Sequence, residues 1–197
     1  MRTTTVYIDI DNTIVNFTKQ AVKKFNELCG TDKKYEDVIK YDFTDLFPDL
    51  TQEKKREIYL NNFYKGIEKY ENVDEALKQI SKMFKIVFVT RGSKNSLQEK
   101  EEWLKNNLDK TIKYQFIGLP LETDKSSIDM KKGIIIDDQV DMLKSSNADM
   151  KILYADKRIE TEWNDYLQNI DSYIVQDWNE ILEILTFIKK VGVYTND

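Results

Sequence analysis

The chain has 197 residues, of which 41% are hydrophobic and 33% charged, and its formal net charge is −5. This profile is typical of a soluble chain with one core and room for a small inserted domain, and its acidic balance disfavours a stable nucleic-acid partner. The lack of histidine excludes Ser-His-Asp catalysis and histidine-bound zinc, and the single cysteine, Cys29, excludes an intrachain disulfide. Any metal should therefore be a hard cation bound by oxygen, and carboxylates, lysines or tyrosines should carry acid–base chemistry.

The first predicted strand covers residues 4–9, a short apolar run with β-branched side chains. Residues 17–70 then show helical and aromatic segments and no convincing strand. This stretch is too long for an ordinary connection between elements. We therefore predict a core domain of residues 1–16 and 71–197, with a small helical cap domain of residues 17–70 inserted after the first strand.

From residue 73 onward, helical and strand patterns alternate. A helical pattern at 73–83 precedes a predicted strand at 85–90, and a helix at 93–108 precedes a weaker strand candidate at 114–117. The apolar run at 133–137 is typical of a strand covered on both faces. Weaker strand candidates at 151–154 and 173–175 precede a final helix at 178–188. The alternation predicts an α/β fold with a Rossmann-like parallel sheet.

Two carboxylates, Asp9 and Asp11, stand at the end of the first predicted strand. In a parallel α/β sheet, ligands bind at the carboxyl ends of the strands, and the two-residue spacing sends both side chains to one side. Two neighbouring like charges are costly to bury unless a cation or a shared proton relieves them. For this pair alone, a solvated strand end followed by a helix N-cap remains an open alternative.

Later strand ends carry further polar residues. Thr90 ends the strand at 85–90 beside a predicted helix N-terminus, a position where anions bind, although Thr90 and Ser93 could also simply cap that helix. Asp137 and Asp138 form a second acidic pair after the strand at 133–137. Lys125, in the polar stretch 122–127, could supply a positive charge between them, although most lysines are solvated.

In this order, the motifs resemble those of the haloacid dehalogenase-like phosphatases, which have an Asp-x-Asp-x-Thr strand end, a Thr or Ser strand end, a lysine and an acidic pair. The matching residues here are Asp9, Asp11, Thr13, Thr90, Lys125, Asp137 and Asp138. The resemblance covers nearly the whole chain and implies that the predicted sheet is the core of this superfamily.

The resemblance also implies a mechanism. Asp9 would attack phosphorus and form an aspartyl-phosphate, while Asp11 would protonate the leaving oxygen and then activate water. Mg²⁺ would be bound by the Asp9 and Asp137 side chains and by the main-chain carbonyl of Asp11. Thr90 and Lys125 would bind phosphoryl oxygens, and Asp138 would orient Lys125 or a metal-bound water.

A closer resemblance is to the 5'(3')-deoxyribonucleotidase family. It rests on the segments Asn62-Phe63-Tyr64, Thr123-Asp124-Lys125 and Ile136-Asp137-Asp138, together with the Thr90 strand end. The family's Thr-Ser-Pro-x-Lys segment reads Thr90-Arg91-Gly92-Ser93-Lys94 here, so Lys94 matches while Arg91 and Gly92 depart. We include Arg91 and Lys94 with Thr90 and Lys125 among the candidate phosphate-binding residues.

Two further positions differ from that family. Asn12 stands where glycine is usual, and asparagine is among the residues that best tolerate a left-handed turn. The gap between Lys125 and Asp137 is slightly longer than the family's, which leaves Lys131 and Lys132 as alternatives for the phosphate-binding lysine.

Aromatic residues in the predicted cap narrow the substrate. A helical cap closing over the site favours small substrates, and one or two of its rings could stack on a planar base, although a small helical core also needs large residues. The candidate substrate-binding residues are Phe43, Phe63 and Tyr64.

Together, these features predict a Mg²⁺-dependent phosphatase that hydrolyses nucleoside monophosphates, with 5'- or 3'-deoxyribonucleotides as the expected substrates. The open alternatives are another small phosphorylated metabolite, a polynucleotide 3'-phosphate, or a non-catalytic binding protein of the same fold. No apolar run approaches the roughly 20 residues of a membrane helix, and the first residues lack the apolar stretch of a signal peptide, so we expect a cytoplasmic protein without a membrane partner. The preferred base, the sugar, the phosphate position and the oligomeric state, a homodimer included, stay open.

Overall fold

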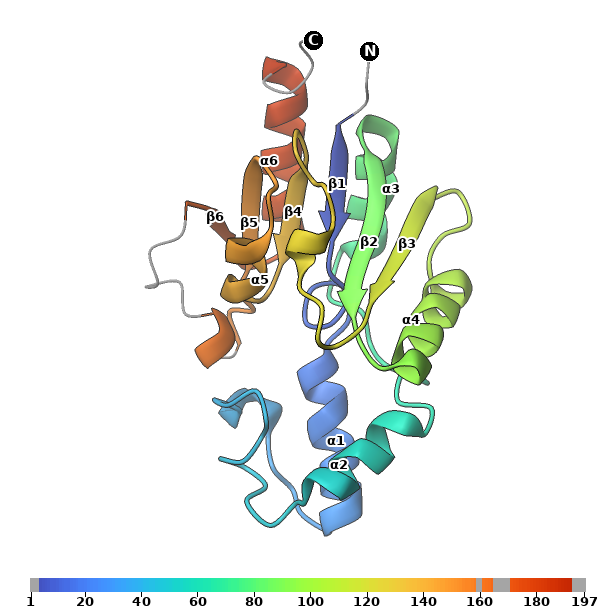
Figure 1. Cartoon of the computed structure of the whole chain (residues 1–197), viewed down its shortest axis with the longest axis vertical. Coiled ribbons are helices and arrows are strands. Elements are labelled where there is room, and N and C mark those ends of the chain that lie inside the picture. Colours follow the sequence, from blue (N-terminus) through green and yellow to red (C-terminus); the bar gives the residue numbers. More distant parts are fainter. Residues whose placement is uncertain (1–3, 159–160, 165–170, 193–197) are drawn as a thin grey trace.

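The computed structural model describes residues 4–158, 161–164 and 171–192. Six parallel strands form one sheet with the order β3-β2-β1-β4-β5-β6 (Figure 1). The strands are β1 (Thr5–Ile8), β2 (Lys85–Arg91), β3 (Tyr114–Leu119), β4 (Ile134–Asp137), β5 (Met150–Tyr154) and β6 (Tyr173–Val175). All six predicted strands are present, and the predicted α/β class is confirmed.

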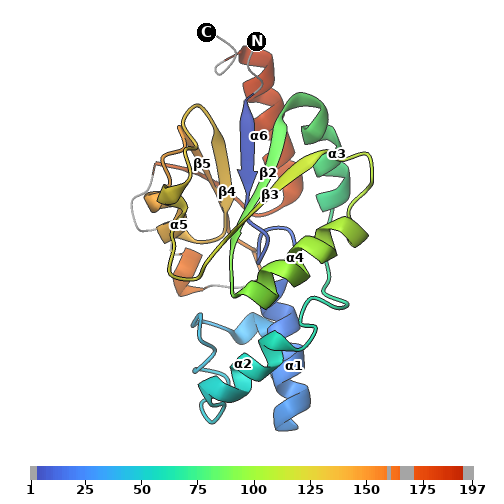
Figure 2. The same ribbon diagram turned by 45° about the vertical axis from the view of Figure 1, so that its right-hand side comes forward.

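Helices connect the strands and cover both faces of the sheet. They are α1 (Phe17–Cys29), α2 (Gln52–Leu60), α3 (Val73–Met83), α4 (Lys94–Asn107), α5 (Val140–Ser145) and α6 (Trp178–Val191), with short 3₁₀ turns η1 (Tyr35–Asp37), η2 (Lys125–Ser127) and η3 (Glu162–Asn164). The helices α3 and α6 pack against each other on one face, and α5 packs on β4 and β5 (Figure 2). None of the described helices combines the length and apolar character that crossing a membrane requires.

Successive residues of the central strands point into two different cores. Ile8 and Ile136 belong to the core beneath α3 and α6, whereas Val87 and Ile135 belong to the core beneath α5. Because both faces are covered, these strands must be apolar on both sides, which explains their near-continuous hydrophobic runs.

Residues 17–70 contain α1, η1 and α2 and contribute no strand to the sheet. They form a lobe beyond the carboxyl ends of the central strands (Figures 1 and 2). Aromatic side chains fill the lobe, where the ring of Phe25 lies 5.3 Å from that of Phe43 and 5.4 Å from that of Phe47. The division into a core domain and a cap domain at residues 16 and 70 stays a prediction.

The chain enters and leaves this lobe at neighbouring points. The amide of Asn16 donates to the carbonyl of Glu68 at 2.9 Å, and the amide of Tyr70 donates to the carbonyl of Ile14 at 3.1 Å. The two crossing segments are therefore hydrogen-bonded to each other just after the end of β1.

Candidate active site

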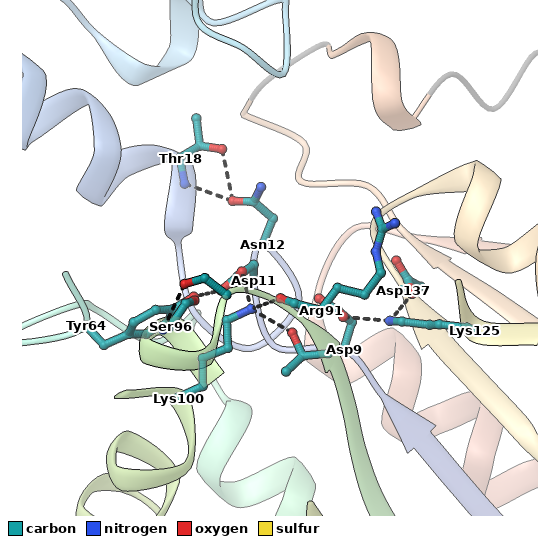
Figure 3. A network of polar contacts seen from close by, with 12 residues as sticks. Asp9, Asp11, Asn12, Thr18, Tyr64, Arg91, Ser96, Lys100, Lys125 and Asp137 are labelled. Carbon is teal, nitrogen blue, oxygen red and sulfur yellow. Dashed lines mark hydrogen bonds and ion pairs between the residues drawn. The ribbon is translucent and has the colours of Figure 1, made fainter. Parts of the chain in front are cut away.

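The site begins at the turn that follows β1. The amide of Asp9 still donates to Ile136 of β4 at 2.9 Å, as in a continuing strand. The chain then turns around the carbonyl of Ile10, which accepts the amides of Ile14 and Val15 at 3.0 and 3.1 Å. This turn leaves the carboxylates of residues 9 and 11 at the carboxyl edge of the sheet (Figure 3).

Asn12 occupies the left-handed region in this turn, with a φ of 51°, as its place at a glycine position predicts. Its side-chain oxygen accepts hydrogen bonds from the amide and the hydroxyl of Thr18, at 2.9 and 3.0 Å. The turn is thus tied to the first residues of α1 (Figure 3).

Lys125 lies between two carboxylates from different strands. Its Nζ donates to Asp9 Oδ1 at 2.6 Å and to Asp137 Oδ2 at 2.5 Å, and all three side chains are buried. The alternative lysines, Lys131 and Lys132, are exposed in the turn before β4. The structure therefore brings Lys125, and neither alternative, between the candidate nucleophile and the candidate metal ligand.

The pKa values of this group reflect its burial. Burial, assisted by the charge of Asp9, raises the pKa of Asp137 to about 6 against the opposing attraction of Lys125. Burial would lower the pKa of Lys125, but attraction to Asp137 and Asp9 outweighs it and holds that pKa above its usual range. The ammonium therefore stays charged and neutralises part of the acidic group.

Asp138 completes an acidic cluster with Asp9 and Asp137, in which one oxygen of each lies within 4.8 Å of the others. Its Oδ2 accepts the indole N–H of Trp163 at 2.7 Å, whereas its buried Oδ1 has no hydrogen-bond partner among the described residues. Burial, together with Asp137 and Asp9, raises the pKa of Asp138. Three buried carboxylates facing one ammonium, Lys125, leave an excess of negative charge, and an all-oxygen donor set suits Mg²⁺. These residues fit a divalent cation. Coordination of that cation by the main-chain carbonyl of Asp11 stays a prediction.

Lys100 of α4 is a site residue that the sequence did not single out. Its Nζ pairs with Asp11 Oδ2 at 2.8 Å, and it also donates to Thr90 Oγ1 at 2.8 Å and to the carbonyl of Arg91 at 2.7 Å. The hydroxyl of Tyr64, from the lobe, donates to Asp11 Oδ1 (Figure 3). Both carboxylate oxygens of Asp11 are therefore held, one from the core and one from the lobe.

Two adjoining cavities open at this edge of the sheet. The smaller, of about 40 Å³, is lined by Asp9, Asp11, Thr90, Arg91, Lys125 and Asp137 among others. The larger, of about 480 Å³, extends from Asp11 and Lys100 to α2. Because Asp11 and Arg91 line both, the candidate acid–base group lies where the two cavities meet.

The predicted binding residues are distributed unequally over these cavities. Phe63 and Tyr64 line the larger one, and Arg91 lines both, with its Nη1 donating to the carbonyl of Leu121 at 3.3 Å. Lys94, at the first position of α4, is exposed and lines neither cavity. Phe43 is buried and also lines neither, because its ring packs inside the lobe. The structure thus places neither Lys94 nor Phe43 at these cavities, and their binding roles stay predictions.

The lobe also touches the loop that follows β5. The amide of Glu162 donates to the carbonyl of Ile39 at 3.1 Å, and its side chain accepts the amide of Tyr41 at 3.3 Å. The ring of Tyr41 meets Trp163 edge-on at 5.7 Å. Since Trp163 holds Asp138, this contact connects the lobe with the acidic cluster.

Residues 2–191 match the family model described as "5' nucleotidase, deoxy (Pyrimidine), cytosolic type C protein". The chain belongs to this deoxynucleotidase family. The predicted resemblance to the haloacid dehalogenase-like phosphatases and to their nucleotidase branch is thereby confirmed. The protein is accordingly a hydrolase of the phosphatase type that acts on phosphate monoesters.

Solved structures of other proteins share the fold of this chain. A haloacid dehalogenase-like hydrolase from Streptococcus pneumoniae is 14% identical with a TM-score of 0.62, covering 92% of this chain and 98% of its own. A predicted phosphatase from Clostridium acetobutylicum is 15% identical with a TM-score of 0.63, and the match covers 95% of this chain and 100% of that chain. The HAD-hydrolase YfnB from Bacillus subtilis, bound to magnesium, is 14% identical with a TM-score of 0.56, and the match covers 94% of this chain and 100% of that chain. No curated protein matches the chain.

Proposed function

We propose that the protein is a Mg²⁺-dependent nucleotidase that releases phosphate from nucleoside monophosphates, deoxyribonucleotides among them. The observation that carries the proposal is the larger cavity, which starts at Asp11 and is walled by the rings of Phe17, Tyr59 and Phe63. A leaving group that takes its proton from Asp11 starts where the two cavities meet; of the two, only the larger, of about 480 Å³, has room for a nucleoside, and its aromatic walls suit a planar base.

In the proposed reaction, the Asp9 carboxylate attacks phosphorus and the aspartyl-phosphate forms on its side chain. Asp11, held by Lys100 and Tyr64, gives a proton to the leaving oxygen and then takes one from the hydrolytic water. Lys125 orients the Asp9 carboxylate and faces the phosphoryl oxygens with its charge.

The acidic cluster supports the metal dependence of the proposal. Asp9 and Asp137 would hold Mg²⁺, with Asp138 beside them as a further oxygen ligand or a partner of a bound water. Bound Mg²⁺ supplies the positive charge that lets an anionic nucleophile approach an anionic phosphate.

A substrate panel tests the proposal. The purified protein with Mg²⁺ should release phosphate from at least one nucleoside monophosphate faster than from sugar phosphates or from a 3'-phosphorylated oligonucleotide. The variant Asp9→Asn should lose at least about a thousandfold in kcat, since it removes the nucleophile. Asp32→Asn, at an exposed loop position, should retain full activity.

Two outcomes would contradict the proposal. Hydrolysis of sugar phosphates without any nucleotide would replace the substrate class while leaving the chemistry in place. Full activity of Asp9→Asn would overturn the catalytic assignment itself.

A cytoplasmic location forms part of the proposal. The chain contains a single cysteine, so its stability does not depend on an oxidising compartment.

A further inference from the structure

One face of α2 is directed into the larger cavity. Gln52, Lys55 and Arg56 all line it, and their spacing of three and four residues places them on one side of the helix. The same cavity reaches Asp11 and Lys100 on the core side. A molecule whose leaving group lies against Asp11 therefore extends toward these cationic side chains.

Lys55 is a buried cation that forms no ion pair with a carboxylate of the described residues. Lys55 is 3% exposed, and its Nζ donates to the main-chain carbonyl of Asp42. The ion pairs found among the described residues do not include it. The Asp42 carboxylate instead accepts the amide and the hydroxyl of Thr44, at 3.0 and 2.7 Å. The Asp42 carboxylate, which also lines the cavity, attracts the Lys55 ammonium without pairing with it, and the cavity is the side from which a further negative charge can reach this buried cation.

Arg56 adds a second positive charge to the same face. Its side chain is exposed at the cavity wall and forms no ion pair with any residue that the structure describes. A guanidinium offers a planar fork of N–H donors that matches the oxygens of a phosphate. In contrast, Lys100 at the opposite wall is already neutralised by Asp11.

We propose that the α2 face formed by Gln52, Lys55 and Arg56 binds a second phosphate group of the substrate, so that the protein prefers nucleoside 3',5'-bisphosphates to nucleoside monophosphates. The inference rests on the proposed nucleotidase function and deepens it. One phosphate lies at Asp9, the nucleoside fills the aromatic part of the cavity, and the other phosphate meets Lys55 and Arg56. A cavity of about 480 Å³ is in the range that holds a ligand of this size.

The ratio of kcat/KM for a deoxynucleoside 3',5'-bisphosphate to that for its 5'-monophosphate tests the inference. The native protein should favour the bisphosphate by about tenfold or more, the size of a charge-assisted contact. Arg56→Gln should reduce this ratio toward one. Lys54→Gln removes an equal charge from the same helix, but Lys54 is exposed in a different groove beside Lys24 and Glu57, so the ratio should persist. A native ratio of one or less, or equal losses in the two variants, would overturn the inference.

Failure of the nucleotidase function gives a different result, namely no hydrolysis of either nucleotide. In that case, calorimetry on the native protein with Mg²⁺ compares the two affinities directly. Tighter binding of the bisphosphate that is lost in Arg56→Gln supports the second phosphate site. Equal affinities, or no binding of either nucleotide, would overturn it.

Discussion

Two buried lysines neutralise different carboxylates of the site. Lys125 lies between Asp9 and Asp137, whereas Lys100 pairs with Asp11. Burial raises the pKa of Asp11, although Lys100 opposes this effect. Two neighbouring carboxylates with different partners can take different roles, as a nucleophile and an acid–base group must.

The variant Lys100→Met tests the role of this lysine. It leaves the Asp11 carboxylate without its cation, so kcat should fall about a hundredfold, the usual contribution of acid–base catalysis. Because the Asp11 side chain keeps 25% exposure, we expect a loss of about 2 kcal/mol in unfolding free energy, less than for a fully buried pair. Activity assays and urea unfolding measure the two effects. Lys105→Met, at an exposed position of the same helix, should change neither; equal effects in both variants would contradict the role.

The sequence predicted the site residues that follow strands and missed one that lies on a helix. Asp9 and Asp137 meet because parallel strands end at the same edge of the sheet. Lys100 lies in a strongly charged helix, where a lysine is usually solvated. The available signal was its spacing, three and four residues before the buried Trp103 and Leu104, which places it on the inward face.

At the scale of elements, the turn between β1 and α1 positions both catalytic candidates. It depends on a left-handed residue, Asn12, and on two hydrogen bonds from Thr18 to the Asn12 side chain. Substitutions at this position therefore test backbone conformation and side-chain bonding together.

Asn12→Gly and Asn12→Ala separate these two contributions. Both variants lose the bonds to Thr18, but only alanine must hold its Cβ in a left-handed conformation, at a cost of about 1 kcal/mol. We expect the alanine variant to be the less stable by that amount in chemical unfolding. Equal stability of the two variants would show that the turn changes its conformation.

The core elements were predictable from sequence because strands covered on both faces must be apolar throughout. The lobe was predictable only as a helical insertion. Between α1 and α2, it consists largely of turns whose shape depends on aromatic packing, and no periodic pattern encodes that packing. Phe43 illustrates the limit, since its ring faces Phe25 inside the lobe rather than the cavity.

At the scale of the whole molecule, the acidic cluster, as the proposed metal site, would link metal binding to stability. Folding brings the carboxylates of Asp9, Asp137 and Asp138 together against the charge of a single lysine. A cation that binds only the folded state should therefore raise the melting temperature.

Thermal unfolding with and without Mg²⁺ measures this effect. At a Mg²⁺ concentration of 100 times its Kd, the free energy of unfolding of the native protein should rise by about 2.7 kcal/mol. Asp137→Asn should lose most of the increase, whereas Asp149→Asn, at an exposed loop position, should retain it. A melting temperature that does not respond to Mg²⁺ would contradict the metal assignment.

The paired crossings between Asn16 and Glu68 and between Ile14 and Tyr70 have a consequence for how this chain can diverge. The residues between these crossings form one inserted segment, and the two hydrogen bonds hold its two ends together. Each doubling of the length of this segment costs only about 0.6 kcal/mol of loop-closure free energy, so insertions or deletions between α1 and α2 leave the pairing of the strands intact. Lys55 and Arg56 lie inside this segment, and Asp9 and Lys125 lie outside it. Preference for a leaving group can therefore change by replacement within this segment, as long as Thr18 keeps its bonds to Asn12 and Tyr64 its bond to Asp11, on which the candidate catalytic residues depend.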